Sequence, residues 1–136
     1  MKQSGLGWTT LSVDDSSGTP NDIKNDITNF QFATPRAVQD VTGVDKSAIE
    51  RILLLADFSI TLNGVFNEDT GKSHETFCTV PSTSVARTVS LAISGRTLAC
   101  ETLFTDYPIT RAASGELTFA VPGVLADGTV PTWAGS

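Results

Sequence analysis

The stretch of sequence that decides the fold is Phe58-Ser59-Ile60-Thr61-Leu62-Asn63. Apolar and polar residues alternate through it, and successive side chains of a β-strand point to opposite faces of the sheet. A strand with this pattern buries one face and leaves the other in water, which is typical of antiparallel sheets. The stretch therefore predicts a half-buried antiparallel strand.

Similar alternation recurs before and after this stretch. Further strands are expected at Trp8–Val13, around Phe30, at Val89–Ser94 and at Glu116–Val121. The sequence therefore predicts a mainly β fold, a small antiparallel β-sandwich or partial barrel with one short α-helix and long loops or arms.

The centre of the chain is expected to form a hairpin. Gly95-Arg96 suits a two-residue turn with glycine first. The strand after it, about Leu98–Thr110, has apolar residues on both faces and needs cover on both sides. Pro108 lacks a ladder donor, so that end is expected to be an edge or a bulge.

The connecting segments have turn-type sequences. Asp14–Asp22 and Asn67–Lys72 are expected to be loops, and Ala112–Gly115 a turn. Ser73 is placed to cap a short helix through Val80, which Pro81 would end.

Val41–Ala56 is compatible with two structures. Asp45 could be a helix N-cap, with Ile49, Ile52 and Leu53 on one helical face. The same segment could instead be a long packed loop or an extended arm between subunits. Its leucines and isoleucines would form an apolar patch that soluble monomers seldom expose.

Composition excludes several classes of protein. The 136 residues, 40% hydrophobic and 18% charged, suit one folded domain spanning 1–136. A net charge of −6 without a dense basic patch argues against a conventional nucleic-acid binder. The sequence has no apolar run long enough for a membrane span. Cys78 and Cys100 are expected to be free thiols in a reducing cytoplasm.

No constellation of residues points to catalysis. His74 is the only histidine, and neither a Gly-x-Ser-x-Gly elbow nor a second zinc-binding histidine accompanies it. His74 and Cys78 have an i, i+4 spacing that could hold a metal, yet they lack further ligands. Asn67, Asp69 and Gly71 resemble the start of a calcium loop whose final glutamate is missing. We therefore expect no catalytic residue, no metal and no cofactor.

Several stretches, in order along almost the whole chain, resemble the tail tube (major tail) proteins of long non-contractile-tailed bacteriophages. They are Thr34-Pro35-Arg36 with Gln39–Gly43, Asp45–Ala48 with Glu50-Arg51, Leu53–Asn67, Leu103–Tyr107, Gly115–Val121 and Leu125–Trp133. No single stretch is a catalytic-grade motif, so the specificity lies in the ordered set.

The resemblance implies a structural virion subunit. Such proteins are small β-sandwiches that assemble into hexameric rings, whose strands join around a lumen and which stack into a tube. The implied partners are copies of the chain itself, the tape-measure protein in the lumen, and the tail terminator and distal tail proteins. Genomic DNA passes through without specific binding during ejection, no membrane is involved, and assembly takes place in the host cytoplasm. Any acidic residues facing the lumen would repel this DNA.

Seven apolar residues are candidates for the subunit interface. The two tryptophans lie near the chain ends, where aromatic residues often dock on a neighbour or on their own domain. The other five belong to the ambiguous segment. The candidates are Trp8, Val44, Ile49, Ile52, Leu54, Leu55 and Trp133.

Two other functions remain open from the sequence. One is a monomeric β-sandwich module that binds carbohydrate or protein, with Trp8 or Trp133 as a sugar platform. The other is a related ring-forming tail component, such as a distal tail or connector protein.

Overall fold

Strands supply nearly all of the regular secondary structure of residues 2 and 4–135, the part that the computed structural model describes. Nine form one sheet in the order β2-β1-β7-β8-β10-β6-β3, with β9 paired to β10 and β11 paired to β8, and β4 pairs with β5 separately. The elements are β1 (Trp8–Asp14), β2 (Pro20–Asp22), β3 (Ile27–Ala33), β4 (Arg36–Asp40), β5 (Arg51–Ala56), β6 (Ser59–Val65), α1 (Ser73–Phe77), β7 (Arg87–Ile93), β8 (Arg96–Phe104), β9 (Ile109–Arg111), β10 (Leu117–Leu125) and β11 (Trp133–Ala134). The predicted mainly β, antiparallel fold with one short helix is confirmed.

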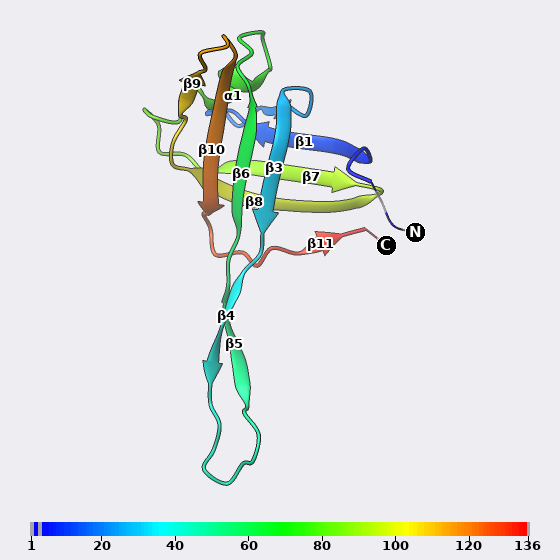
Figure 1. Ribbon diagram of the computed structural model, residues 1–136, viewed down its shortest axis with the longest axis vertical. Helices are drawn as coiled ribbons and strands as arrows, with labels where there is room; N and C mark the ends of the chain where they lie inside the picture. Colours follow the sequence, from blue (N-terminus) through cyan, green and yellow to red (C-terminus); the bar gives the residue numbers. More distant parts are fainter. Residues whose placement is uncertain (1, 3, 136) are drawn as a thin grey trace.

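The large sheet folds over on itself. Strands β3, β6 and β10 run across β1, β7 and β8 (Figure 1). Only the end of β10 pairs with β8, through Gly123↔Phe104 and its two neighbours. A Cβ on Gly123 would lie 2.7 Å from the Thr102 side chain, so glycine permits this close approach. Strands β2 and β3, at the two ends of the order, are not paired with each other, so the described strands form no closed barrel.

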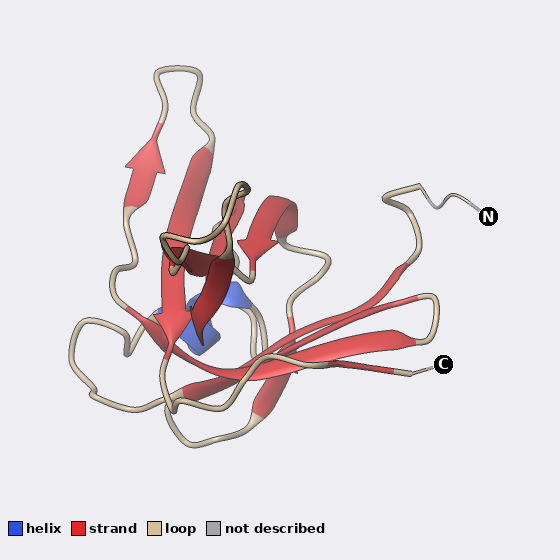
Figure 2. Ribbon diagram, turned by 90° about the horizontal axis from the view of Figure 1, so that it is seen from below, coloured by secondary structure: helices blue, strands red, loops and turns tan. Residues whose placement is uncertain are grey.

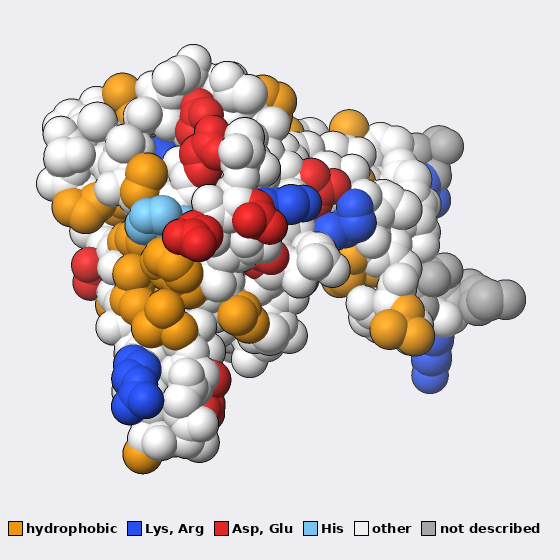
Figure 3. Space-filling model, turned by 90° about the horizontal axis from the view of Figure 1, so that it is seen from above, with side chains coloured by type: hydrophobic (Ala, Val, Ile, Leu, Met, Phe, Trp, Pro, Cys, Tyr) orange, Lys and Arg blue, Asp and Glu red, His pale blue; other side chains and the backbone are white. Residues whose placement is uncertain are grey.

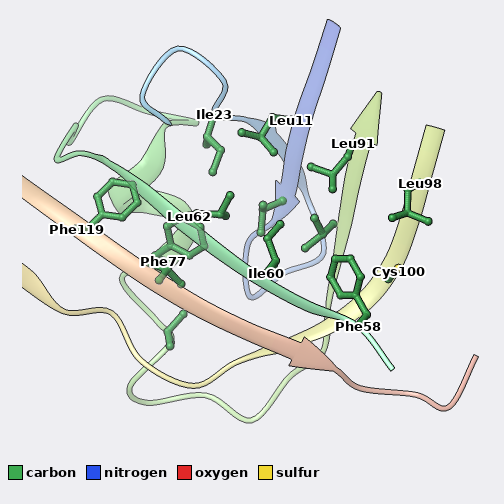
Figure 4. Packing of buried hydrophobic residues seen from close by; sticks show 14 residues of the cluster. Leu11, Ile23, Phe58, Ile60, Leu62, Phe77, Leu91, Leu98, Cys100 and Phe119 are labelled. Carbon is green, nitrogen blue, oxygen red and sulfur yellow. The ribbon is translucent and has the colours of Figure 1, made fainter. Parts of the chain in front are cut away.

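The core lies between the two halves of the sheet. The alternation that predicted the strands decides which side chains enter it, and α1 sits within the fold of the sheet and adds Phe77 (Figure 2). The buried hydrophobic residues are Leu11, Val13, Ile23, Phe58, Ile60, Leu62, Phe77, Val80, Val89, Leu91, Leu98, Cys100, Phe119 and Val121 (Figure 4).

The central hairpin forms one residue earlier than predicted. Ile93 of β7 pairs with Arg96 of β8, so the two turn residues are Ser94 and Gly95. Both have positive φ, 51° and 79°, as a type I′ turn requires. Glycine takes the second turn position, and Arg96 already belongs to the strand.

The strand expected over Leu98–Thr110 is interrupted. Strand β8 ends at Phe104, and β9 begins only at Ile109. Between them Tyr107 turns inward and packs against Phe77 and Phe119. Strand β9 pairs only with β10, which agrees with the edge position predicted from Pro108. Of the two apolar faces predicted here, only the one with Leu98 and Cys100 enters the core, whereas Leu103 and Ile109 on the other face are exposed.

The helix is shorter than predicted and differently capped. It ends at Phe77 instead of Val80, and Lys72 occupies the N-cap position without a side-chain bond. The Ser73 hydroxyl instead donates to the Val65 carbonyl, and its amide to the buried Asp26 carboxylate. Beyond Phe77 the chain continues in turns, with the Val80 amide donating to the Phe77 carbonyl.

The loops lie close to their predicted places. The first is shorter than expected, because β1 continues through Asp14 and β2 starts at Pro20. The Asp15 carboxylate closes it by accepting bonds from the amides of Ser17 and Thr19. The segment of residues 67–72 precedes α1 without forming a strand, as predicted.

The ambiguous segment is an extended hairpin, so the helical alternative for Val41–Ala56 is wrong. Strand β5 pairs with β4, and together with the connecting residues 41–50 they project from the body (Figure 1). Asp45 caps nothing; instead Asp40 accepts the Thr42 amide, and the Thr42 hydroxyl accepts the Glu50 amide. We refer to residues 36–56 as the arm and to the rest of the described chain as the body.

Candidate functional site

The arm is the feature of the molecule that most needs a partner. It leaves the body at a narrow base, where the Asp57 amide donates to the Pro35 carbonyl at 3.2 Å. The Arg36 guanidinium stiffens this base by donating two bonds, of 2.9 and 2.7 Å, to the Leu54 carbonyl. Beyond its base the arm projects from the body (Figure 1) and has no core of its own.

Both faces of the arm are apolar and uncovered. Val38 pairs with Leu53 and projects from the same face, whereas Gln39 pairs with Ile52 on the other face. Leu55 lies on the same face as Leu53, and Leu54 lies on the same face as Ile52, because side chains alternate along a strand. All of the β5 leucines are exposed, Leu55 by 90%. A groove of 590 Å³ beside the arm base is lined by Arg36, Leu53–Ala56 and Val130.

The predicted interface residues fall into two separate places. Five of them lie on the arm, and all five are exposed: Val44, Ile49, Ile52, Leu54 and Leu55. Leu53, which the sequence placed in the same apolar patch without naming it as a candidate, and Val38, which it did not consider, extend this apolar surface. That Val38 and Leu53 lie side by side on one face of the arm could be recognised only once the hairpin register was known.

The two tryptophans meet on one aromatic cluster inside the body. Trp8 packs edge-on against Phe30, with ring centroids 5.0 Å apart, and also contacts Phe32. Trp133 approaches the same Phe32 at 6.0 Å. Trp8 is therefore half-buried by its own domain, whereas Trp133 keeps 48% of its surface exposed.

Two of the open sheet edges lie on one four-stranded part of the sheet. Strands β9, β10, β6 and β3 form a four-stranded unit whose outer edges belong to β3 and β9. Within the described chain neither outer edge has a strand partner. Open edges present unpaired amide and carbonyl groups and are templates for pairing with another chain.

The outward side of this four-stranded unit is uncharged, and we name it the neutral face. Its residues follow from the register, since paired residues project from the same side of a sheet. They are Asn29, Gln31 and Ala33 on β3, Ser59, Thr61, Asn63 and Val65 on β6, Thr118, Ala120, Pro122 and Val124 on β10, and Thr110 on β9. Acidic side chains gather instead on the upper surface, at the end of the body opposite the arm (Figure 3).

The single histidine takes part in packing. Its ring lies against Phe66 with centroids 4.6 Å apart, and Nδ1 is 3.1 Å from the Tyr107 hydroxyl. Burial raises the pKa of Tyr107 to about 12, and the nearby Cys78 contributes further. Cys78 is exposed and Cys100 buried, and both are free. No group of three His, Cys, Asp or Glu residues within the described chain could hold a metal ion.

The structure contains a buried arginine that the sequence analysis did not predict. Arg87 is only 2% exposed, and its guanidinium donates to the carbonyls of Asp14 and Thr76 and to the Thr79 hydroxyl. Desolvation lowers the pKa of Arg87, which nearby acidic groups partly oppose. The side chain ties β1 and β7 to the end of α1. Its position in the alternation of β7, in register with Val89 and Leu91, is the signal that could have found it.

The α1 helix of the described chain is too short to cross a membrane. Its role is to close one end of the core, where Phe77 packs against Phe104 and Phe119.

Comparison with known proteins gives structural matches only. No protein-family model and no curated protein matches the sequence. A chain in the virion of a native gene transfer agent particle aligns over 96% of this chain and 99% of its own, with a TM-score of 0.71 and 16% identity. A chain in the tail of an empty gene transfer agent particle, a helical assembly with C6 symmetry, aligns over 99% of both, with a TM-score of 0.72 and 16% identity. The protein therefore has the fold of a chain from a six-fold symmetric particle tail, in agreement with the fold that its resemblance to tail tube proteins implies.

Proposed function

We propose that this protein is a structural, non-enzymatic virion subunit that self-assembles into stacked hexameric rings and so forms a tail tube for genome passage. The observation that carries the proposal is the arm, a hairpin with apolar side chains on both faces and no cover, on a fold shared with a chain of a C6-symmetric tail. Its partners are other copies of the chain, a tape-measure protein in the lumen, and tail terminator and distal tail proteins.

The arm supplies the adhesive surface. Burying a leucine side chain stabilises an assembly by about 1.5–3 kcal/mol relative to leaving it in water. Leu53 and Leu55 on one face and Ile52 and Leu54 on the other can be covered together only if neighbouring subunits pack against both sides. A ring neighbour and a subunit of the next ring would meet this requirement.

The open edges supply a way to close the ring. Within one subunit the β3 and β9 edges lie at opposite ends of the four-stranded unit. The β3 edge of one copy could therefore pair with the β9 edge of the next copy. Such a head-to-tail contact is heterologous and generates a closed ring when the rotation per subunit allows it. Pairing the two edges would satisfy backbone groups that are otherwise left to water.

A monomeric sugar-binding module has weaker support. A stacking platform needs an aromatic face open to the ligand, whereas Trp8 packs into the Phe30 and Phe32 cluster. Trp133 is half-exposed but also rests on Phe32. The aromatic cluster is therefore explained by packing within the body.

Negative-stain microscopy of the purified protein tests the proposal. Tubes or stacked rings are expected; isolated single rings would favour a distal tail or connector protein, and compact monomers would contradict both.

The arm itself is tested by Leu54→Ser combined with Leu55→Ser. Because both side chains are exposed in the subunit, we expect a folded, soluble protein with an unchanged melting temperature that no longer forms tubes. Val85→Ser changes an exposed apolar residue of the body and serves as a control that should still assemble. Normal tubes from the double variant would show that the arm is not the interface.

A further inference from the structure

The base of the arm continues the pairing of β3 with β6. The last pair of that ladder is Ala33↔Ser59, and the first pair of the arm is Arg36↔Ala56. Both strands advance by three residues between these two pairs, so the register does not change where the chain leaves the body. The bond donated by the Asp57 amide lies between the two pairs. The base of the arm is therefore in register with the sheet.

The register shifts one step further out, within the arm. The pair that follows Arg36↔Ala56 is Val38↔Leu53. Between these pairs β4 advances by two residues and β5 by three, so β5 contains one extra residue. An extra residue of this kind is a β-bulge, which interrupts the ladder locally and bends the strand. The shifted step is therefore the place where the arm can change its direction relative to the body.

The Arg36 side chain bridges this step. Its Nε and Nη2 atoms both donate to the Leu54 carbonyl, at 2.9 and 2.7 Å, and so join β4 to β5 where the ladder is interrupted. The guanidinium is planar and its donors have a fixed spacing, so two bonds to one oxygen fix orientation as well as distance. Pro35 comes directly before Arg36, and its ring fixes the backbone angle φ on the same strand. Both features restrict the direction of the arm.

We infer that Arg36 is a positioning residue for assembly, which fixes the direction of the arm before a second copy of the chain binds. This inference rests on the proposed function, in which the arm is the adhesive surface. An isolated two-stranded hairpin is marginally stable in water, and the arm has no core of its own. Holding a binding segment in its bound conformation reduces the conformational entropy that is lost on association. Arg36 thus raises the affinity between subunits through the arm.

Arg51 provides a matched comparison within the arm. It is also an exposed arginine, and it begins β5 at the outer end of the hairpin. Its backbone pairs with Asp40, beyond the shifted step. Replacing Arg51 removes the same charge from the same hairpin but leaves the bonds to the Leu54 carbonyl in place. The two arginines therefore separate the effect of position from the effect of charge.

Distances measured by pulsed electron paramagnetic resonance test the direction of the arm in free subunits, at a concentration below that needed for tubes. Spin labels are attached to Gln39→Cys on β4 and Ala99→Cys on β8, both exposed positions. Cys78→Ser removes the exposed native thiol. We expect a narrow distance distribution with Arg36, a broad one with Arg36→Met, and an intermediate one with Arg36→Lys, which retains a single ammonium donor. Arg51→Met should leave the distribution narrow.

The critical concentration, the lowest protein concentration at which tubes form, tests the consequence for assembly. Arg36→Met should raise it by about 2- to 12-fold, as expected for the loss of hydrogen bonding of ordinary net strength. Arg36→Lys should raise it less, and Arg51→Met should leave it unchanged. Sedimentation of the assembled material measures this concentration. The melting temperature of the subunit should be the same in all these variants, because the arm lies outside the core.

Four results would overturn the inference. An unchanged distance distribution for Arg36→Met would show that other contacts fix the arm. A raised critical concentration with an unchanged distribution would mean that Arg36 contacts the neighbour directly. A broad distribution with an unchanged critical concentration would show that the direction of the arm does not limit assembly. Equal effects from Arg51→Met would assign the result to charge.

Failure of the proposed function can be distinguished from failure of this inference. An unmodified chain that forms no tubes would refute the proposed function, and with it the role of Arg36 in assembly. The distance distributions of the free subunits would still decide whether Arg36 fixes the direction of the arm.

Discussion

In the body, the long strands of the sheet have one face in the core and the other in water, whereas both faces of the arm meet water. Leu62 and Leu91 are fully buried, while Leu53 and Leu55 on the arm are among the most exposed apolar residues of the chain. The same residue type therefore has two roles. In the body it stabilises the subunit, and on the arm it is available to a second molecule. Three measurements on the isolated subunit can break or sharpen this comparison.

The largest effect is expected from truncating matched leucines. Leu91→Ala should lower the free energy of unfolding by about 3–5 kcal/mol, because it removes buried methyl groups and leaves a cavity. Leu55→Ala should change it by no more than about 0.5 kcal/mol, as is usual for exposed positions. Denaturant unfolding of both variants measures the difference. Equal losses would mean that the arm is packed in the free subunit.

A smaller change in the free energy of unfolding is expected from replacing the two arginines that donate hydrogen bonds to backbone carbonyls. Arg87→Met leaves the buried Thr76 carbonyl and the part-buried Asp14 carbonyl without this donor and should cost about 1–3 kcal/mol. Arg36→Met breaks the bonds to the Leu54 carbonyl, but water replaces them there, so a change within about 0.5 kcal/mol is expected. Thermal unfolding of both variants provides the test, and a costly Arg36→Met would show a rigid, protected arm base.

The smallest effect concerns the ionisation of Tyr107, at the border of the core. Its pKa is raised from 10.0 to about 12, so between these values the unfolded chain loses the phenolic proton while the folded chain keeps it. The folded state thus loses stability as the pH rises from 10 towards 12, and gains nothing from this group at neutral pH. Because Tyr107 is the only tyrosine, its ultraviolet absorbance follows the titration directly. A midpoint near 10 in the folded protein would contradict the burial.

Tyr107→Phe is the control for this titration. The variant should show a shallower fall of stability between pH 10 and 12 than the unmodified protein, since lysines and cysteines titrate similarly in both. An identical slope would assign the pH dependence to those other groups.

The alternating strands were predictable because the hydrophobic period is a local property of the chain. Phe58, Ile60 and Leu62 entered the core as their spacing indicated, and so did Val89, Leu91, Phe119 and Val121. The turn at Ser94-Gly95 was predicted within one residue, since only its exact register depends on the pairing of β7 with β8. The ordered resemblance to tail tube proteins, also visible in the sequence, implied the same small β-sandwich fold.

The tertiary structure alone decided what depends on the surroundings of a residue. A run such as Ile52-Leu53-Leu54-Leu55 suits a buried helix, a packed loop or an arm equally well, and only the position of β4 and β5 outside the body distinguishes them. The burial of Arg87 follows from its strand, which places its guanidinium against the carbonyls of Thr76 and Asp14. The neutral face likewise exists only after pairing, because it joins residues of four strands that are distant in sequence. Sequence periodicity determines which side of each strand is apolar, whereas the fold determines which strands become neighbours and which apolar surfaces remain uncovered.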